Sequence, residues 1–318
     1  MRTRFLKALL VALALPLAAA VQDSTPIRII VPTPPGGTND GVARALQAPL
    51  QRLLGRTVIV EYKPGAAGSV GSAFVARSKP DGNTLLLNNN AVFINPLVSR
   101  TTGYETRDLV PVAVAAVSPM VLIGSADIPL VDTKGLIDYA AKQAQPLAYG
   151  SAGGVGSLGH LAMEGFARAA GIKLLHVPYV GGGPVQMAVS TGEVKLVMTS
   201  LNAALKGQVE AGRIRLLGVA AAKATPLVPG ARPIGEALPG FEVDAWFGLL
   251  APAQTPLAAV QRIAAAVGQA LETAEVRDQL LAIGSQPTFL GPEPFQRRVD
   301  QEAQRWGEIV REQRIQKE

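Results

Sequence analysis

The sequence predicts an α/β protein of two domains, each a mixed, mostly parallel sheet flanked by helices. The chain of 318 residues, 48% hydrophobic and 17% charged, is long enough for two cores. Short β-branched runs alternate with amphipathic segments, as in right-handed βαβ units, and this alternation restarts near residue 128. We expect residues 21–124 and 246–318 to form one domain and residues 125–245 the other. Two crossovers, near Gly124 and Ala245, would join them as a hinge.

The first strand is expected at residues 27–31, and a Pro/Gly-rich loop, residues 32–37, follows it. A helix should begin at Thr38, and Pro49 predicts that it kinks or ends early. Such a loop presents backbone N–H groups at the positive end of a helix dipole, which favours an anion. Asp40 is expected to cap the helix or to hold the loop.

A further strand, residues 84–87, runs directly into Asn88, Asn89 and Asn90. Three amides at the end of a buried strand suit hydrogen bonding to a ligand, although an Asn-rich turn is the alternative. The apolar stretch 109–124 is interrupted by Pro111 and Pro119, so it predicts two buried strands rather than a membrane helix.

In the second domain, three strand ends carry glycine or small polar residues: 150–157, 179–184 and 199–202. Ligands of open α/β sheets bind at the carboxyl ends of strands, so these loops are candidate binding loops. None of them contains Arg or Lys. The C-terminal helices, expected from residue 256 onward, should pack back on the first domain.

Residues 1–20 combine basic residues, an apolar run and small residues, which is typical of a secretory signal peptide cleaved after Ala20. The run is too short for a membrane anchor. Its removal leaves 27 Lys and Arg against 24 Asp and Glu, with no basic stripe, so a nucleic-acid partner is not expected. The sequence has no cysteine, so stability must come from core burial.

Enzymatic motifs are weak. Gly154, Gly156 and Gly159 satisfy G-x-G-x-x-G, but residues 176–183 contain neither the acid nor the arginine of a dinucleotide site. No serine fits G-x-S-x-G, and no Cys/His cluster or HExxH occurs, so we expect no catalytic residue, no metal and no cofactor. An exported hydrolase acting through Ser157 is the weakest hypothesis. His160 could orient a loop serine, point into the cleft or be structural.

Several segments together resemble the tripartite tricarboxylate transporter receptor family, the TctC or Bug periplasmic solute-binding proteins. They are VPTPPGGTNDGVAR, PGAAGSVGSAFVARSKPDGNTLLL, INP, YGSAGGVGSLGHL, HVPYVGGGP, EAGRIRLLGV and WFGLLAP. The resemblance implies a two-domain Venus-flytrap fold, type II-like, which closes on a carboxylate without catalysis. It also implies that backbone N–H groups, hydroxyls and water hold the carboxylate.

The resemblance also implies the contact residues. In the first domain they are Pro34, Gly36, Gly37 and Thr38, with Asn88, Asn89 and Asn90 in place of the usual Gly/Ser/Thr-rich segment. In the second domain they are Ser151, Ala152, Gly156, Ser157, His160, Tyr179 and Gly181. Thr199 and Asn202 stand where many members carry Asp and Pro, which weakens an amino-acid ligand without excluding it.

The leading hypothesis is a monomeric periplasmic receptor for a dicarboxylate or an acidic amino acid such as glutamate or aspartate. Its partner would be the membrane permease of a tripartite tricarboxylate-type transporter. The alternative is a receptor that docks on a membrane sensor for signalling.

Overall fold

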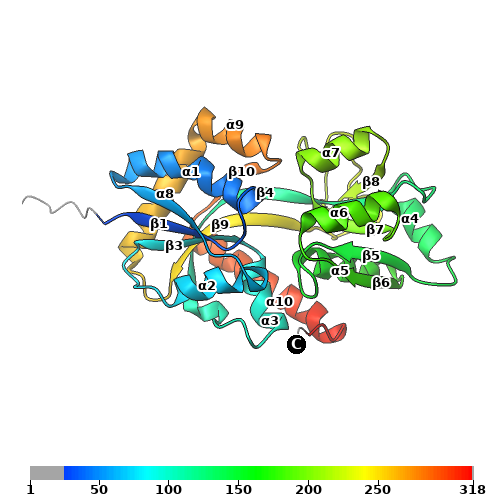
Figure 1. Cartoon of the computed structure of the whole chain (residues 1–318), viewed down its shortest axis with the longest axis horizontal. Helices are drawn as coiled ribbons and strands as arrows, with labels where there is room; N and C mark the ends of the chain where they lie inside the picture. Colours follow the sequence, from blue (N-terminus) through cyan, green and yellow to red (C-terminus); the bar gives the residue numbers. More distant parts are fainter. Residues whose placement is uncertain (1–24, 317–318) are drawn as a thin grey trace, which may run out of the picture.

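Two α/β halves are joined by two long strands that cross between them (Figure 1). The computed structural model describes residues 25–316, so the expected signal peptide lies outside the described residues. The strands are β1 (Ile27–Val31), β2 (Val58–Tyr62), β3 (Thr84–Asn89), β4 (Leu109–Ser125), β5 (Leu147–Ser151), β6 (Leu174–Pro178), β7 (Leu196–Ser200), β8 (Ile214–Val219), β9 (Asp244–Pro252) and β10 (Gln286–Leu290). The helices are α1 (Thr38–Leu54), α2 (Ser69–Ala76), α3 (Ala91–Val98), α4 (Thr133–Ala140), α5 (Leu158–Ala170), α6 (Gly182–Thr191), α7 (Ala203–Glu210), α8 (Leu257–Glu272), α9 (Ala274–Ala282) and α10 (Pro292–Glu312). The predicted α/β fold class is confirmed.

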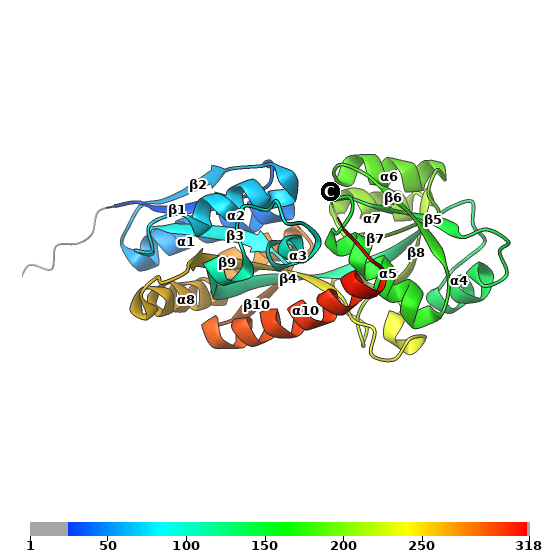
Figure 2. The same ribbon diagram turned by 90° about the horizontal axis from the view of Figure 1, so that it is seen from below.

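In the first half the strand order is β2-β1-β3-β9-β4-β10. The pairs of β1 with β2 and β3 are parallel. Strand β9 is antiparallel to β3, and β10 is antiparallel to β4. Helices α1, α8 and α9 cover one face, and α2, α3 and α10 cover the other (Figures 1 and 2). The parallel strands end toward the second half, which places the β1–α1 loop there.

The second half has the order β4-β7-β5-β6, with β8 also paired to β4. Strands β5, β6 and β7 are mutually parallel. Helices α4 to α7 surround this sheet. The loops after β5, β6 and β7 therefore lie at one edge, as the sequence predicted.

Strand β4 is continuous over 17 residues, so the expectation of two separate strands was wrong. Pro111 lies at a register shift in the pairing with β9, where a missing N–H is tolerated. Pro119 is the last β4 residue paired with β9, and from Met120 the strand pairs with the second half. Both prolines thus occupy positions where the ladder is irregular or changes partner.

Of the two outcomes expected at Pro49, a kink or an early helix end, the early end is wrong, because α1 continues five residues further to Leu54. Pro49 lies on the buried face of the helix with Val42, Leu46 and Leu50. Burial of this apolar face offsets the lost backbone hydrogen bond, and Gly55, in a left-handed conformation, ends the helix.

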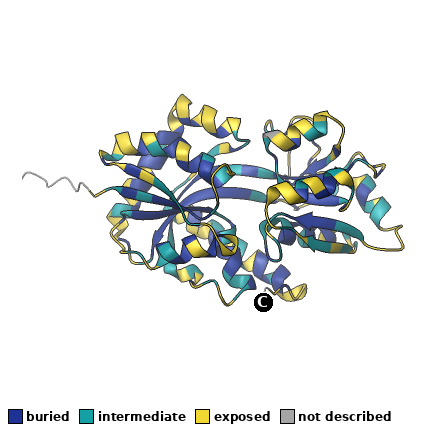
Figure 3. Cartoon of the chain, in the orientation of Figure 1, coloured by how far each residue is buried: buried dark blue, intermediate teal, exposed yellow. Residues whose placement is uncertain are grey.

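Helix α10 contacts both halves (Figure 2). Its beginning packs on β4 and α3. Near its end, Glu312 forms an ion pair with Arg168 of α5 at 2.9 Å. The crossing strands are buried, whereas the outer faces of the surrounding helices are exposed (Figure 3). Across residues 25–316, none of the helices combines the length and the hydropathy that a membrane span requires.

Candidate ligand-binding site

The β1–α1 loop is held by Asp40, as the sequence suggested. Its carboxylate accepts hydrogen bonds from the Gly36 N–H at 2.8 Å, from Arg44 at 2.7 Å and from the Tyr62 hydroxyl at 2.6 Å. Burial opposes ionisation of Asp40, but the hydrogen bonds from Tyr62, Gly36 and Arg44 outweigh it and lower the pKa of this carboxyl. The Gly36 N–H is therefore used inside the protein.

The next N–H groups along the chain remain open. Gly37 is the N-cap of α1, has extended backbone (φ −87°, ψ 175°) and makes no side-chain cap. The N–H groups of Gly37, Thr38 and Asn39 have no hydrogen-bond partner within residues 25–316. They form an anion-binding helix N-terminus whose donors begin one residue after Gly36.

Two side chains beside this N-terminus carry buried oxygens without a partner in the described chain, Thr33 Oγ1 and Asn39 Oδ1. Asn39 is only 4% exposed. Buried polar atoms normally have hydrogen-bond partners, so these two oxygens mark a place for water or for a ligand. Sequence reasoning did not include either residue among the contacts, although the position of Thr33 in the loop and of Asn39 in the first turn of α1 was the available signal.

The three asparagines at the end of β3 have different environments. Asn88 points inward and donates to the Ser72 hydroxyl at 3.2 Å, while Asn89 accepts from the Ala91 N–H at 3.0 Å. Asn88 lies near the loop, since a Cβ added to Gly68 would be 3.8 Å from Asn88 Nδ2 and 3.5 Å from Pro32 Cβ. Asn89 thus follows the turn alternative.

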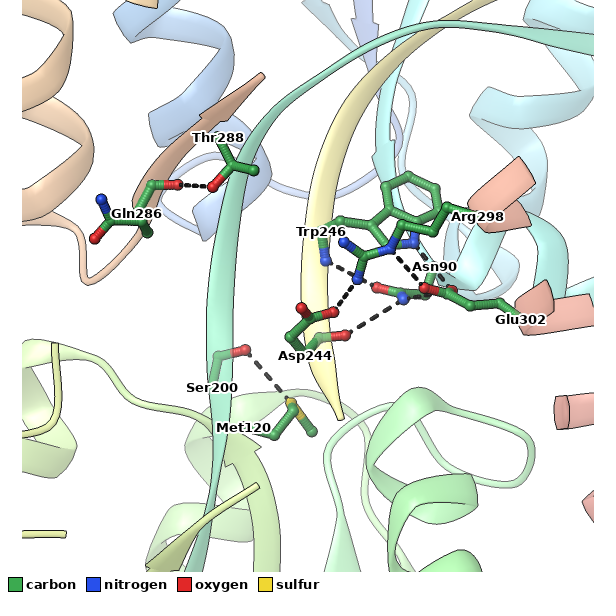
Figure 4. Close-up of polar contacts among 9 residues, drawn as sticks. All are labelled: Asn90, Met120, Ser200, Asp244, Trp246, Gln286, Thr288, Arg298 and Glu302. Carbon is green, nitrogen blue, oxygen red and sulfur yellow. Dashed lines mark hydrogen bonds and ion pairs between the residues drawn. The ribbon is translucent and has the colours of Figure 1, made fainter. Parts of the chain in front are cut away.

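The Asn90 side chain instead points toward Trp246 of β9 and Glu302 of α10 (Figure 4). Its Oδ1 accepts from the backbone N–H of Trp246 at 3.1 Å, and its Nδ2 donates to the Glu302 carboxylate at 2.8 Å. Glu302 also accepts from Arg298, which in turn pairs with Asp244. Because its amide is used in this cluster, we leave Asn90 out of the proposed contact set.

In the second half, most polar groups of the β5–α5 loop are also used internally. The Gly156 N–H donates to His160 Nδ1 at 2.9 Å, and Ser151 Oγ contacts His176 Nε2 at 2.7 Å. His160 is 5% exposed, so it supports the loop from the interior of the second half. Ser157 accepts from the His160 N–H as the N-cap of α5, which leaves the Ser157 O–H free to donate.

The β6–α6 loop is joined to this one, because the Gly181 N–H donates to the Ala152 carbonyl at 2.6 Å. Gly181 is the N-cap of α6 at φ +93°, without a side-chain cap. The Tyr179 hydroxyl donates to Glu193, and Asn202 caps α7 by accepting from the Leu205 N–H. Thr199 is half-buried in β7.

The two halves touch at the candidate loops. A Cβ added to Gly156 would lie 2.5 Å from Val98 Cγ2 of α3, and one added to Gly284 would lie 2.7 Å from the Leu201 carbonyl oxygen. The N-terminal ends of α1 and α6 face each other across the space between the halves (Figure 1). The structure therefore brings the predicted loops of both halves to one place.

Cations near the first loop already have partners. Arg44 binds Asp40 and the Tyr62 hydroxyl, and the Lys63 ammonium lies 4.2 Å from the centroid of the Phe74 ring. Over residues 25–316, no group of three or more His, Asp or Glu side chains is arranged to hold a metal ion. The donors available to an anion are thus backbone amides and hydroxyls.

Two α/β halves, joined by crossing strands and facing each other with open helix N-termini, define a bilobal solute-binding receptor. Residues 42–315 match the family model described as the tripartite tricarboxylate transporter family receptor. The chain belongs to this family, and the resemblance noted in the sequence is confirmed. It is a periplasmic solute-binding receptor of the tripartite tricarboxylate type and not an enzyme.

Curated relatives support the assignment over nearly the whole chain. The protein BugT of Bordetella pertussis is 30% identical over 94% of this chain and 93% of its own length. A UPF0065 protein from the tcbD-tcbE intergenic region of Pseudomonas sp. (strain P51) is 34% identical over 92% of this chain and 87% of its own.

Solved structures agree. A Rhodopseudomonas palustris protein determined with adipate has a TM-score of 0.80 at 33% identity, covering 92% of this chain and 98% of its own. MatC of the same organism, with bound malate, has a TM-score of 0.74 at 28% identity, covering 89% and 98%. The periplasmic binding protein BugD has a TM-score of 0.76 at 29% identity, covering 92% and 99%.

Proposed function

We propose that the protein binds a small dicarboxylate between its halves and delivers it to the membrane subunits of a tripartite tricarboxylate-type transporter. The observation that carries the proposal is the open N-terminus of α1. Asp40 accepts the Gly36 N–H, and those of Gly37 and Thr38 have no partner among residues 25–316. The similarity to proteins that bind adipate and malate supports a dicarboxylate. The chemistry at Thr199, a hydroxyl rather than a carboxylate, makes an acidic amino acid the weaker candidate.

The proposed mechanism is closure about the crossing strands. Residues 21–124 and 246–318 would form one domain and residues 125–245 the other. One carboxylate would bind the α1 N-terminus, and the second would bind the open ends of α5 and α6 with the Ser157 hydroxyl. A ligand that contacts both domains stabilises the closed state by its differential affinity for that state.

A panel of dicarboxylates tests the binding step. Succinate, malate, glutarate, adipate, aspartate and glutamate would be compared by thermal shift and calorimetry with the uncharged diamides of the same length. We expect at least one dicarboxylate to raise the melting temperature while its diamide does not. If none of the dicarboxylates shifts it, and no carboxylate co-purifies, the proposed function is wrong.

Thr38 allows a direct test of the backbone donor. Proline is well accommodated at the first helical position after an extended residue such as Gly37, so Thr38→Pro removes one N–H without breaking α1. We expect Thr38→Pro to weaken binding about tenfold or more, because one hydrogen bond to a charged group is worth about 1.5–3 kcal/mol. Thr38→Ala keeps the N–H and is the matched control, which should bind better than Thr38→Pro.

Delivery to a permease is tested in cells. A deletion strain should lose growth on the bound dicarboxylate as sole carbon source, and the wild-type gene should restore it. Normal growth together with a lost transcriptional response would favour the sensor role instead.

A further inference from the structure

Five side chains form a buried or half-buried array beneath the β5–α5 loop. The rings of His160 (α5) and His176 (β6) are stacked, with centroids 3.8 Å apart and planes 9° from parallel. Tyr149 of β5 has ring contacts with both imidazoles, and its hydroxyl donates to Glu164 of α5. Ser151 Oγ lies 2.7 Å from His176 Nε2 at the end of the array.

The hydrogen-bond partners fix the tautomer of His160 and restrict that of His176. His160 Nδ1 receives the Gly156 N–H, so Nδ1 carries no proton and the ring proton is on Nε2, which lies 3.9 Å from Glu164 Oε1. Ser151 Oγ lies 3.1 Å from the Gly154 carbonyl oxygen and 2.7 Å from His176 Nε2. We assign the hydroxyl proton to the carbonyl, so that Ser151 accepts from His176 Nε2–H. In this assignment both histidines carry a proton on Nε2.

Through these contacts the array controls the backbone of the loop at two places, Gly154 and Gly156. The residues that follow, Leu158 and Gly159, open α5 and have N–H groups without a partner in the described chain. Their direction depends on how the loop enters the helix. Gly156 also lies against Val98 of the other half, so a displaced loop would meet that half differently.

We propose that His160 and His176 are positioning residues, whose neutral imidazoles hold the β5–α5 loop so that the Leu158 and Gly159 N–H groups and the Ser157 hydroxyl can bind a ligand carboxylate. Neither histidine touches the ligand in this arrangement. The inference rests on the proposed carboxylate site and assigns these residues a role different from the direct contact expected of His160.

The surroundings keep the pair neutral. Burial and the neighbouring His176 lower the pKa of His160 to about 3, and burial lowers the pKa of His176 to about 4. The titratable groups that face the pair are Glu164 on α5 and Tyr149 on β5, and burial together with Glu164 raises the pKa of Tyr149. A proton on His160 Nδ1 would remove the acceptor that the Gly156 N–H has in the described chain.

Isosteric variants separate this role from simple core packing. His160→Asn retains an oxygen near the position of Nδ1, whereas His160→Leu retains the volume but offers no acceptor. His176→Gln similarly retains a donor near Nε2, and His176→Leu does not. All four remove a ring stack, so a purely structural role would affect both members of each pair alike.

The first measurement needs no ligand. NMR gives the rate of amide hydrogen exchange of Gly156 in each folded, ligand-free variant. We expect exchange about tenfold or more faster in His160→Leu than in His160→Asn, because only the Leu variant leaves the N–H without an acceptor. Equal exchange in the two variants would overturn the inference, whatever the protein binds.

The second measurement is calorimetric titration with adipate, or with the panel member that binds wild type if adipate does not. We expect about a tenfold loss of affinity in each Leu variant and less than about threefold in the Asn and Gln variants. Equal affinities within each pair would also overturn the positioning role. Absence of any carboxylate binding by wild type would contradict the proposed function, while the exchange result would still stand or fall by itself.

Discussion

The carboxylate of Asp40 lies 2.8 Å from the backbone nitrogen of Gly36 and accepts its hydrogen bond. The two residues are only four positions apart in the sequence. Their hydrogen bond determines which backbone N–H groups of the loop remain available to a ligand. It closes the turn over the first residues of α1 and leaves Gly37 as the first free donor. The part of the loop that can bind an anion thus starts at the helix cap itself.

Replacement of Asp40 is expected to loosen this loop. Asp40→Ala removes the acceptor of three hydrogen bonds at a site only 6% exposed, and we expect a loss of about 2–3 kcal/mol in the free energy of unfolding, measured in urea. Carboxylate affinity should fall as well. Arg44→Ala is the matched control, since its side chain is 58% exposed, and it should change both quantities much less. Equal effects of the two variants would contradict the assigned role of Asp40.

The sequence was sufficient to predict the alternation of strands and helices, because the helical and strand periodicities along the chain are clear, but it did not predict α3. The early helix end that it allowed at Pro49 and its error at Pro111 and Pro119 are corrected by tertiary context. A buried helix face offsets the hydrogen bond lost at Pro49. Pro111 lies at a register shift and Pro119 at the point where β4 changes partner, so the sheet tolerates both. A proline rule describes the local chain and contains no information about such compensation.

The site could be predicted at the level of loops but not of atoms. Whether a loop N–H is available to a ligand depends on whether a side chain of the protein accepts its hydrogen bond, as His160 does for Gly156. The direction of Asn90 depends on Glu302, which lies 212 residues away in the sequence. No local pattern encodes that pairing, so the triple Asn appeared to be a single set of ligand contacts.

Gly156 is expected to control how closely the halves approach. In Gly156→Ala the new Cβ would lie within 3.0 Å of three atoms of Val98. Gly154→Ala is a control for backbone strain, since its φ of +70° resembles the +76° of Gly156 but its added Cβ meets nothing closer than 4.0 Å. We expect Gly156→Ala to weaken dicarboxylate binding about tenfold more than Gly154→Ala, as determined by calorimetry.

A compensating change completes this test. Val98→Ala added to Gly156→Ala removes the two methyl groups that the new Cβ meets, and it should recover part of the lost affinity. No recovery would mean that contact between these two residues does not limit closure.

The two stacked histidines, His160 and His176, predict acid sensitivity. Their pKa values in the folded protein, about 3 for His160 and about 4 for His176, lie below the ordinary value of 6.5. The unfolded chain therefore binds more protons below pH 6.5, and stability falls as the pH decreases from there toward the folded pKa values. Between pH 7 and 5.5, where most carboxylates stay ionised, we expect a loss of up to about 1 kcal/mol per histidine.

Urea unfolding at several pH values across this range measures the effect. His176→Gln should lose less stability than wild type over the same interval, because one of the two groups no longer titrates. A wild-type stability that is constant from pH 7 to 5.5 would show that the histidines are not held neutral.

Asn90 is expected to matter for stability and not for ligand contact. It is 1% exposed, and its amide joins β3 to Trp246 of β9 and to Glu302 of α10 (Figure 4). Asn90→Ala leaves the buried Trp246 N–H without an acceptor, so we expect about 2 kcal/mol lower stability in urea unfolding. Asn89→Ala, which removes only the bond to Ala91, is the matched control and should cost less. At a temperature where the variant is fully folded, calorimetry should give a dicarboxylate affinity within about threefold of wild type, since the Asn90 amide points away from the binding loops. A large loss of affinity with unchanged stability would return Asn90 to the ligand contacts and place the site deeper, toward the crossing strands.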